Sequence, residues 1–209
     1  MRIGYFADGP WSHDALSKIV AEPGLEVVFI TPRYDTQDPV LKRWADKLKV
    51  PFIPHQDVNQ VDFLKRVESL NADLFVSMSF NQILKREIIN FPRLGFINCH
   101  AGALPFYRGR NPLNWALING EPRIGITAHY IDEGIDTGDI IKVNKFLINT
   151  ESETVVSLEK NSMDVLQKTV LEVFKDAISS TDILKTTPNV GGRYVSRLEM
   201  ESMKKIIDG

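Results

Sequence analysis

Six hydrophobic runs of strand length recur along the chain, and most of them are apolar at successive rather than alternate positions. They span residues 2–7, 25–31, 74–78, 95–100, 126–131 and 140–146. Strands that are apolar on both faces are typical of a sheet covered by helices on two sides. The stretches between the first four runs are long enough for crossover helices. We therefore predict an α/β fold with an open, mostly parallel sheet and helices on both faces.

Apolar residues recur at helical spacing between and after these runs. The predicted helices span residues 13–21, 39–48, 58–70, 84–89 and 112–117, each bounded by Pro, Gly, Asp or Asn. Further on, Thr150 and Glu153 have the spacing of a capping box. An apolar stripe follows them, formed by Val155, Leu158, Ser162, Leu166, Val170 and Phe174. This pattern predicts a long helix that packs on the sheet.

The composition changes after Ile178, where Ser, Thr, Asp, Pro and the pair Gly191-Gly192 replace the apolar pattern. We predict one domain over residues 1–180 and a C-terminal extension over residues 181–209. Within the extension, residues 188–198 combine a Gly-Gly turn signal with a short β-prone stretch, which predicts a β-hairpin. A lone hairpin is only marginally stable in water, so it needs a surface to pack on.

Composition and charge argue against disordered, coiled-coil, membrane-spanning and nucleic-acid-binding classes of protein. The 209 residues are 43% hydrophobic and 25% charged, which disfavours disorder and coiled coil. The net charge of −2 gives no broad attraction to nucleic acid or acidic lipid, so neither is an expected partner. The single cysteine, Cys99, allows no intramolecular disulfide and suits a reducing compartment. No apolar stretch reaches membrane-spanning length and Met1 runs straight into a strand, so we expect a cytoplasmic protein.

Asn98 and His100 lie two residues apart on a predicted strand, so both side chains point to the same face. The strand then enters a Gly-containing turn, which places the pair at the carboxyl end of the sheet, where open α/β folds bind ligands. A structural reading stays open for the pair alone, in which Asn98 caps a turn and His100 is a hydrogen-bonded core histidine. His129 lies on another strand-like run and could face the site or be structural.

Four acidic residues and two glycines follow one another between two strand-like runs, at residues 132–139. Gly and Asp favour turns, and acidic side chains usually face water, so this segment could be an ordinary loop. The oxygen-ligand spacing and downstream Glu of an EF-hand are missing. We therefore predict no metal site.

Together, FINCHAGALPFYRGRNP (residues 96–112) and GITAHYIDEGIDTGDII (residues 125–141) resemble the core of the folate-dependent formyltransferases. That family's pattern is N-x-H, then Leu-Pro-x-Tyr-Arg-Gly, then Asp-x-Gly-x-Asp-x-Gly. The resemblance covers residues 1 to about 180 and implies a Rossmann-like formyltransferase fold with N10-formyltetrahydrofolate as cosubstrate. It also implies that residues 79–84 form the pterin-binding loop. The implied cofactor-binding residues are Phe80, Gln82, Ile83, Leu84, Asp132 and Gly134.

The resemblance makes Asn98, His100 and Asp136 the catalytic residues. When a primary amine attacks the formyl carbon, negative charge develops on the formyl oxygen. The Asn98 amide and a protonated His100 can donate hydrogen bonds to that oxygen, and histidine can also carry the amine's proton. Asp136 can orient the imidazole and favour its charged form.

Among the branches of this family, the chain is most similar to the sugar N-formyltransferases, which act on nucleotide-linked amino sugars such as a dTDP-amino-dideoxyhexose. The matching features are a Gly-Pro-Trp loop, an Arg-Gly-x-Asn-Pro segment and a short extension. The implied substrate-binding residues are Gly9, Pro10, Trp11, Tyr107, Arg108, Arg110, Asn111 and Trp115. Guanidinium groups suit a diphosphate and Trp suits a base, although loop Arg residues are often solvated and Trp residues are often core.

Other readings remain open on sequence. A phosphoribosylglycinamide formyltransferase has a similar length, although Pro10 and Trp11 do not suit a simple phosphate cradle. A methionyl-tRNA formyltransferase is disfavoured by the net charge of −2 and the end of the chain at Gly209. A formyltetrahydrofolate hydrolase and an inactive folate-binding relative are the remaining alternatives. The resemblance also implies a homodimer that pairs near the predicted hairpin.

Overall fold

The computed structural model describes residues 1–149, 151–180, 184–192 and 194–195 of the chain. Its centre is a six-stranded sheet in the order β2-β1-β3-β4-β6-β7. The strands are β1 (Arg2–Ala7), β2 (Glu26–Pro32), β3 (Leu74–Met78), β4 (Phe96–His100), β6 (Arg123–Tyr130) and β7 (Ile140–Leu147). The first four are parallel to one another, whereas β6 and β7 run antiparallel to their neighbours. The predicted open, mostly parallel sheet is confirmed.

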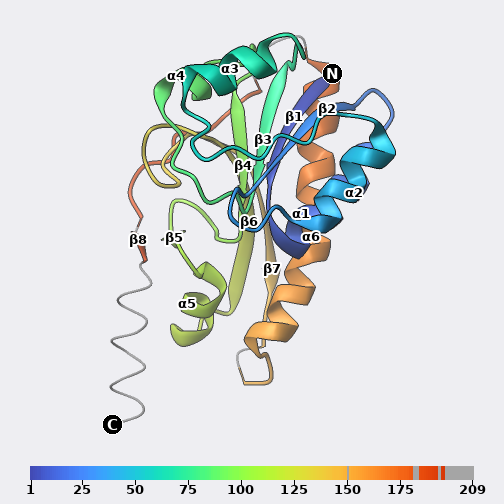
Figure 1. The fold of residues 1–209 in the computed structure, drawn as a ribbon. Coiled ribbons are helices and arrows are strands. Elements are labelled where there is room, and N and C mark those ends of the chain that lie inside the picture. Colours follow the sequence, from blue (N-terminus) through green and yellow to red (C-terminus); the bar gives the residue numbers. More distant parts are fainter. Residues whose placement is uncertain (150, 181–183, 193, 196–209) are drawn as a thin grey trace.

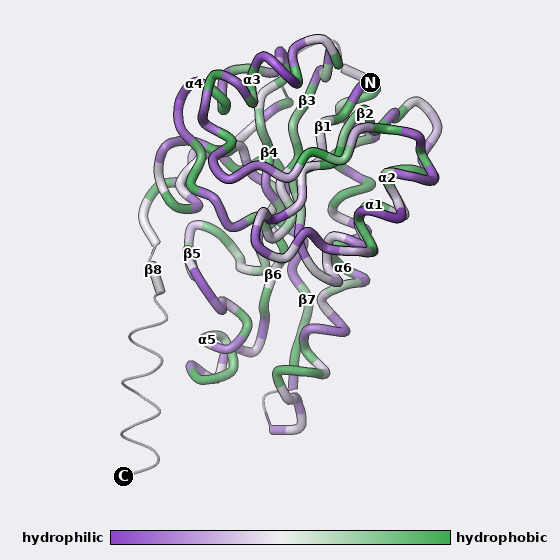
Figure 2. Tube along the Cα trace, viewed as in Figure 1, coloured by the Kyte–Doolittle hydropathy of each residue, from purple (hydrophilic) through white to green (hydrophobic). Residues whose placement is uncertain are grey.

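Helices cover both faces of this sheet, as Figure 1 shows. They are α1 (Gly9–Ala21), α2 (Pro39–Leu48), α3 (Val61–Glu68), α4 (Arg86–Ile89), α5 (Pro112–Ile118) and α6 (Val155–Ser179). One core cluster joins the sheet to α1, α2 and α6, and a second joins the opposite face to α3 and α4. The hydropathy colouring of Figure 2 follows this arrangement, since the sheet strands are the most continuous hydrophobic segments. Strands covered on both sides explain the uninterrupted apolar runs of the sequence.

The second core is largely aromatic. Phe6 of β1 contacts the rings of Phe29, Phe63, Phe75, Phe80 and Phe96, with centroid separations between 4.9 and 5.9 Å. Pairs at such distances stabilise by about 0.5–1.5 kcal/mol each beyond their burial. Gly4 lies under this cluster, because a Cβ there would come within 2.4 Å of the Phe29 ring. The cluster ties four neighbouring strands, β2, β1, β3 and β4, to α3 and to the loop that follows β3.

The predicted starts of α1, α3 and α4 and the predicted cap of α6 differ from the structure, in which α3 begins at Val61 and α4 at Arg86. Helix α1 begins at Gly9 rather than at residue 13, because Pro10 is tolerated in the first turn of a helix, where no N–H donor is needed. Helix α6 is capped by Thr154 and not by the predicted Thr150, which lies outside the described residues. The Thr154 side chain accepts from the Ser157 amide while the Ser157 hydroxyl accepts from the Thr154 amide. The apolar stripe of α6 is confirmed, since its residues from Leu158 to Phe174 are buried.

The C-terminal segment does not fold as the predicted hairpin in the residues that the structure describes. Thr187 forms an isolated antiparallel bridge with Ile140 at the start of β7. The short strand β8 (Tyr194–Val195) then pairs in parallel with β5 (Arg108–Gly109), so its partner is a distant loop. Residue 193 and residues 196–198 of the predicted hairpin lie outside the described residues. The division into a domain and an extension at residue 180 stays a prediction.

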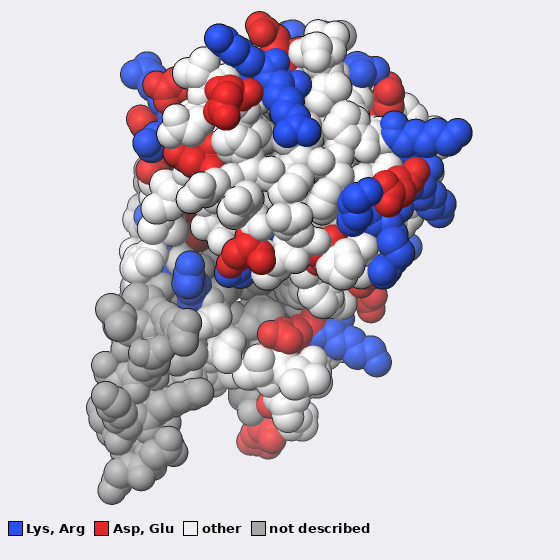
Figure 3. Space-filling view, viewed as in Figure 1, with Lys and Arg blue, Asp and Glu red and all other residues white. Residues whose placement is uncertain are grey.

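Charged side chains of both signs are mixed on the face of the molecule seen in Figure 3, where basic residues gather over α2. The exposed basic residues of this region are Lys42, Arg43, Lys47 and Lys49. Within the described part of the chain, no helix is both long and apolar enough to cross a membrane.

Candidate active site

A cavity of about 730 Å³ opens at the carboxyl ends of the parallel strands. Its walls include Arg33 after β2, Ser79 after β3 and His100 at the end of β4. Open α/β sheets bind ligands at this edge, and the volume falls in the usual range for small-molecule sites. All three predicted catalytic residues, Asn98, His100 and Asp136, line this cavity.

The three residues are brought together by strand pairing and by one strained loop position. Asn98 and His100 lie on β4, and Asn98 is directly opposite His129 on the antiparallel strand β6. Asp136 follows β6 with a φ of +53° and turns its carboxylate between the two imidazoles. Its Oδ2 lies 3.5 Å from His100 Nδ1, and its Oδ1 lies 3.5 Å from His129 Nε2. One carboxylate therefore faces both rings.

His100 is buried, and its ring orientation is set by one hydrogen bond. Nε2 lies 2.7 Å from the Tyr107 carbonyl oxygen, which can only accept, so Nε2 carries a proton. Burial lowers the pKa of His100 below its ordinary value and outweighs the opposing effects of Asp136 and the Tyr107 carbonyl. The resting ring is therefore neutral, although Asp136 favours its charged form. Its unprotonated Nδ1 faces Asp136.

Asp136 is ionised in this setting. Burial alone would raise the pKa of its carboxyl, but the facing His129 and His100 rings and the Gly109 amide outweigh burial and lower the pKa to about 2. The Gly109 N–H donates to Oδ2 at 2.8 Å. A fixed negative charge beside a neutral histidine stabilises that histidine after it takes up a proton.

His129 also lines this cavity, although no role was assigned to it from the sequence pattern. Its Nδ1 lies 2.8 Å from the Tyr130 carbonyl, so Nδ1 carries a proton, and its Nε2 lies 3.3 Å from Asn98 Nδ2. In the neutral form Nε2 accepts from the Asn98 amide, which orients the NH2 group toward the cavity. The alternation of Thr127 and His129 on the strand was the available signal, because it puts both on the face shared with Asn98.

The predicted pterin loop lies on the cavity wall, where Phe80, Gln82, Ile83 and Leu84 all line the space. The Gln82 amide fixes the loop to the segment before α3. Its Oε1 accepts from the Val58 amide at 2.9 Å and its Nε2 donates to the His55 carbonyl at 2.8 Å. Asn59 adds a bond to the Ile83 carbonyl. Ile83 is 75% exposed, so it offers an apolar surface at the cavity mouth.

The acidic loop after β6 forms the opposite wall, and the predicted Asp132 and Gly134 both line the cavity. Asp132 Oδ1 accepts from the Gly134 amide and from the Thr137 hydroxyl, so this carboxylate organises the turn. Gly138 is required for close approach, because a Cβ there would lie 1.8 Å from the Tyr130 carbonyl oxygen. Among the described residues, no group of three or more His, Cys, Asp or Glu side chains is arranged to hold a metal ion.

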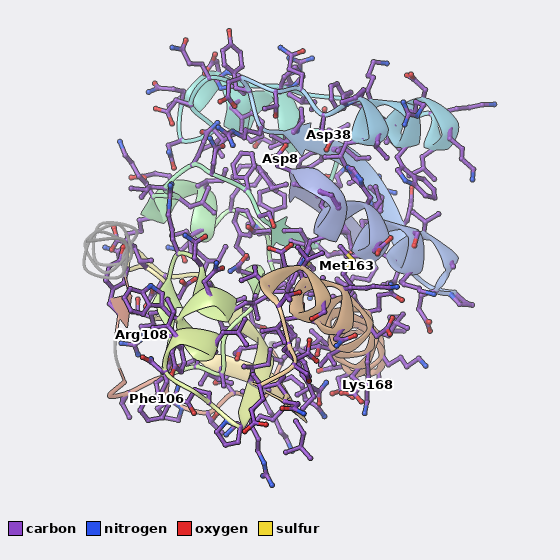
Figure 4. All side chains as sticks on the ribbon, turned by 90° about the horizontal axis from the view of Figure 1, so that it is seen from below. Asp8, Asp38, Phe106, Arg108, Met163 and Lys168 are labelled. Atoms are coloured by element: carbon purple, nitrogen blue, oxygen red, sulfur yellow. The ribbon has the colours of Figure 1, made fainter. Side chains whose placement is uncertain are left out.

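The predicted acceptor-binding residues divide into two groups. Trp11, Arg110 and Asn111 line the cavity. Gly9, Pro10, Tyr107, Arg108 and Trp115 are not part of its wall. Trp115 is only 3% exposed and packs inside, and the Tyr107 hydroxyl donates to Glu121 at 2.5 Å. Arg108 donates to Asn189 and lies beside β8, as Figure 4 shows.

Some cavity residues carry little signal in sequence. Arg33 follows the carboxyl end of β2, so strand position alone could have placed it at this edge. Glu159 comes from α6, and Tyr194 comes from the C-terminal segment. The last two reach the cavity through tertiary packing, which local pattern does not reveal.

Near the first turn of α1, a second group of polar residues fixes the position of Trp11. Asp38 Oδ2 accepts from the Gly9 amide at 3.0 Å and lies 2.7 Å from His13 Nε2, while its Oδ1 caps α2. In Figure 4 the labelled Asp8 and Asp38 lie close together where α1 and α2 begin. The Gly9 and Pro10 positions thus shape the start of α1, and Trp11 is the member of this loop that reaches the cavity.

Comparison with protein families gives one domain match: residues 35–174 match the formyl transferase family. Among curated relatives, the methionyl-tRNA formyltransferase of Clostridioides difficile is 37% identical over 135 residues, covering 65% of this chain and 43% of that protein. The methionyl-tRNA formyltransferase of Clostridium tetani is 31% identical over 191 residues, covering 85% of this chain and 61% of that protein. The chain thus spans about two fifths of the length of the first of these relatives.

Solved structures share the fold at low identity. Glycinamide ribonucleotide transformylase 1 from Symbiobacterium toebii superposes with a TM-score of 0.75 at 18% identity, covering 89% of this chain and 93% of that one. The N-formyltransferase from Helicobacter canadensis, solved with folinic acid and dTDP-3-aminofucose, has a TM-score of 0.73 at 21% identity, covering 94% and 71%. A formyltetrahydrofolate deformylase from Pseudomonas syringae has a TM-score of 0.73 at 19% identity, covering 90% and 66%.

Proposed function

Because the chain belongs to the formyl transferase family, we propose that it moves a formyl group from N10-formyltetrahydrofolate to a primary amine. The observation that carries this proposal is the convergence of Asn98, His100 and Asp136 on one cavity, with Asp136 facing His100 at 3.5 Å. Phe80, Ile83 and Leu84 of the loop 79–84 give the same cavity wall an apolar surface, which supports a flat heterocycle as the donor's head group.

The proposed chemistry follows from the protonation states. The amine nitrogen attacks the formyl carbon, a C–N bond forms, and the carbonyl electrons move onto the formyl oxygen. The Asn98 NH2, oriented by His129, donates to that oxyanion. The neutral His100 accepts the proton that the amine loses, and Asp136 stabilises the resulting imidazolium. Collapse of the intermediate breaks the bond to N10, and the proton passes to N10 to release tetrahydrofolate.

For the acceptor, we propose a nucleotide-linked amino sugar. Trp11 on the cavity wall offers a flat apolar surface for a base. Arg33 and Arg110 on the same wall can pair with diphosphate oxygens. The H. canadensis neighbour, solved with a dTDP-linked amino sugar, supports this class of acceptor by shared fold alone.

A second candidate acceptor is methionyl-tRNA. The observation in its favour is that the curated relatives, which are 31–40% identical to this chain, are named methionyl-tRNA formyltransferases. Their greater length leaves the substrate of this chain open to test. Glycinamide ribonucleotide is the third acceptor, supported by the fold of the S. toebii neighbour.

An acceptor panel distinguishes these possibilities. The protein is incubated with N10-formyltetrahydrofolate and, separately, dTDP-linked and UDP-linked amino sugars, glycinamide ribonucleotide and methionyl-tRNA, and tetrahydrofolate release is followed. We expect kcat/KM to be highest for an amino sugar nucleotide. A higher kcat/KM for either other acceptor would reassign the substrate, and equal release without any amine would indicate hydrolysis instead of transfer.

A further inference from the structure

Asn189, in the C-terminal segment, is buried at 7% exposure and occupies the gap between two loops of the active site. Its side-chain Nδ2 donates to the Asp136 carbonyl and to the Gly138 carbonyl, both at 2.9 Å. A single amide group thus holds both ends of the turn that contains the Asp136 carboxylate.

The other side of the same amide is held by Arg108. Arg108 Nη2 donates one hydrogen bond to the main-chain carbonyl oxygen of Asn189 at 2.7 Å and one to the side-chain Oδ1 of Asn189 at 2.8 Å. Because Arg can only donate and the two loop carbonyls can only accept, the orientation of the amide is chemically fixed. The next residue, Gly109, donates its N–H to Asp136 Oδ2. Arg108, Asn189, Asp136 and Gly109 are therefore linked in a ring, by hydrogen bonds and by the peptide bond between Arg108 and Gly109.

Asp136 needs such support because its backbone is strained. Its φ of +53° lies in the left-handed region, which is unfavourable for a non-glycine residue and persists only where the surroundings hold it. The Asn189 bonds to the carbonyls of residues 136 and 138 fix the turn on the side opposite the Gly109 bond. The carboxylate thereby stays directed at His100.

The segment that carries Asn189 is itself fixed on both sides. Before it, Thr187 exchanges two backbone hydrogen bonds with Ile140, at 2.9 and 2.8 Å. After it, Gly192 packs so tightly that a Cβ would lie 1.8 Å from the Pro105 carbonyl oxygen, and β8 then pairs with β5. Residues 187–192 and 194–195 are therefore anchored to the loops after β4 and β6.

We propose that Asn189 is a positioning residue for the reaction at this site: it fixes the Asp136 turn from outside the cavity and so sets the alignment of the Asp136 carboxylate with His100. Asn189 does not line the cavity, so it acts through Asp136. The kinetic part of this inference rests on the proposed function, whereas the effect of Asn189 on His100 does not.

The test replaces Asn189 with Leu, which keeps the approximate volume and removes every side-chain hydrogen bond. Without the hydrogen bonds of the Asn189 side chain, the Asp136 carboxylate moves away from His100. Its effect of raising the pKa of His100 then weakens. We expect NMR titration of the histidine ring signals, assigned with His100→Asn, to show a lower pKa for His100 in Asn189→Leu than in the wild type. This measurement needs no substrate, so it stands or falls independently of the transferase activity.

The kinetic readout uses N10-formyltetrahydrofolate with the best amine of the acceptor panel. Misalignment of a catalytic group costs rate more than binding, so we expect kcat to fall about tenfold or more while KM for the folate stays within about twofold. Asn189→Ala is the second variant, with the same expected direction. Val190→Ala is the matched control, because Val190 is the next residue and is 74% exposed, and it should resemble the wild type.

Three results would overturn the proposal. Either Asn189 variant could fold normally and leave both the His100 titration and kcat unchanged. Alternatively, kcat could be unchanged while only KM rises, which would make Asn189 a binding determinant. If both variants fail to fold, Asn189 is a stability residue and the positioning role is rejected. If the panel finds no amine substrate but the His100 titration shifts, the proposed function fails and the positioning role stands.

Discussion

His100 must satisfy two opposing requirements, and its surroundings show how. Burial favours the neutral ring, which can accept a proton, whereas the ionised Asp136 at 3.5 Å stabilises the ring once it is protonated. An imidazole that rests in the neutral form and is stabilised when protonated can take up and release a proton during the reaction with a small change in free energy. The same carboxylate faces His129, which orients Asn98, so one charge supports both the proton acceptor and the oxyanion donor.

His100→Asn tests this role at the level of a single residue. Asparagine retains polarity but cannot accept the proton of the amine, so turnover should fall at least ~10²-fold. The measurement is kcat from tetrahydrofolate release, with circular dichroism and thermal unfolding to show that the fold is intact. Folded variant protein that keeps more than about a tenth of the wild-type turnover would disprove the assignment.

Burial of His100 also predicts a pH dependence of stability. The folded pKa of His100 lies below the ordinary value of 6.5, so as pH falls below 6.5 the unfolded chain binds a proton that the folded chain resists. The free energy of unfolding should therefore fall as pH falls below 6.5. Asp136 affects stability at lower pH, because its pKa is about 2 in the folded chain and 3.8 ordinarily. Its ionised carboxylate stabilises the fold above pH 3.8, and this stabilisation is lost as pH falls toward 2.

Urea unfolding at pH 7, 6 and 5 measures the predicted slope, and His100→Asn is the control, because it removes the titrating group and should flatten the curve. A wild-type curve as flat as that of the variant below pH 6.5 would show that His100 titrates alike in the folded and unfolded states.

At the scale of elements, the loop after β3 owes its shape to contacts with the segment before α3. Gln82→Ala removes both hydrogen bonds to Val58 and His55, so the loop of residues 79–84 should lose its fixed conformation. We expect folate affinity to fall about fivefold or more, in line with ~1 kcal/mol or more for the lost bonds. Titration of tryptophan fluorescence with 5-formyltetrahydrofolate measures this affinity.

Gln56→Ala is the matched control for the loop, since Gln56 is an exposed glutamine on the same segment. A one-residue insertion after Gln82 should weaken folate binding further and leave binding of the amine substrate nearly unchanged. Equal loss of both affinities in calorimetry would contradict separate folate and acceptor regions within the cavity.

The strands were the elements that the sequence predicted best, because burial on both faces leaves an uninterrupted apolar run: β1 and β3 match residue by residue. The start of α1 was missed because Gly9 and Pro10 act as turn residues in most contexts, and here Asp38 from a distant loop accepts the Gly9 N–H. The same limit applies to β8, since its partner β5 lies more than 80 residues away and no local pattern reports that pairing.

In the candidate site, too, some residues could be predicted from the sequence and others could not. Asn98 and His100 were predictable because strand geometry puts alternate side chains on one face, and Asp136 followed from the resemblance in the loop. Arg108 and Trp115 were expected at the substrate, but Arg108 is engaged by Asn189 and Trp115 is buried. Residue type suggested a binding role for both, whereas tertiary contacts decide which side chains reach the cavity.

For the whole molecule, we predict a homodimer whose contact includes the C-terminal extension. In the described part of this extension Val190 is 74% exposed and Tyr194 is 47% exposed, so apolar surface is available for a second copy. Deleting residues 186–209 removes Val190 and Tyr194 with most of the extension and should convert the dimer to a monomer. Light scattering at micromolar concentration measures the mass; a truncated protein that stays dimeric, or a monomeric full-length chain, contradicts the prediction.

The most direct test of the account follows the formyl group itself. The 209-residue chain is incubated with N10-formyltetrahydrofolate that carries a 13C-labelled formyl carbon, with and without the amine selected from the panel, and the label is located by NMR. We predict that the label appears in an N-formyl product only when the amine is present, in step with tetrahydrofolate release, and that His100→Asn loses both. Label found in free formate at the same rate with and without the amine would contradict transfer.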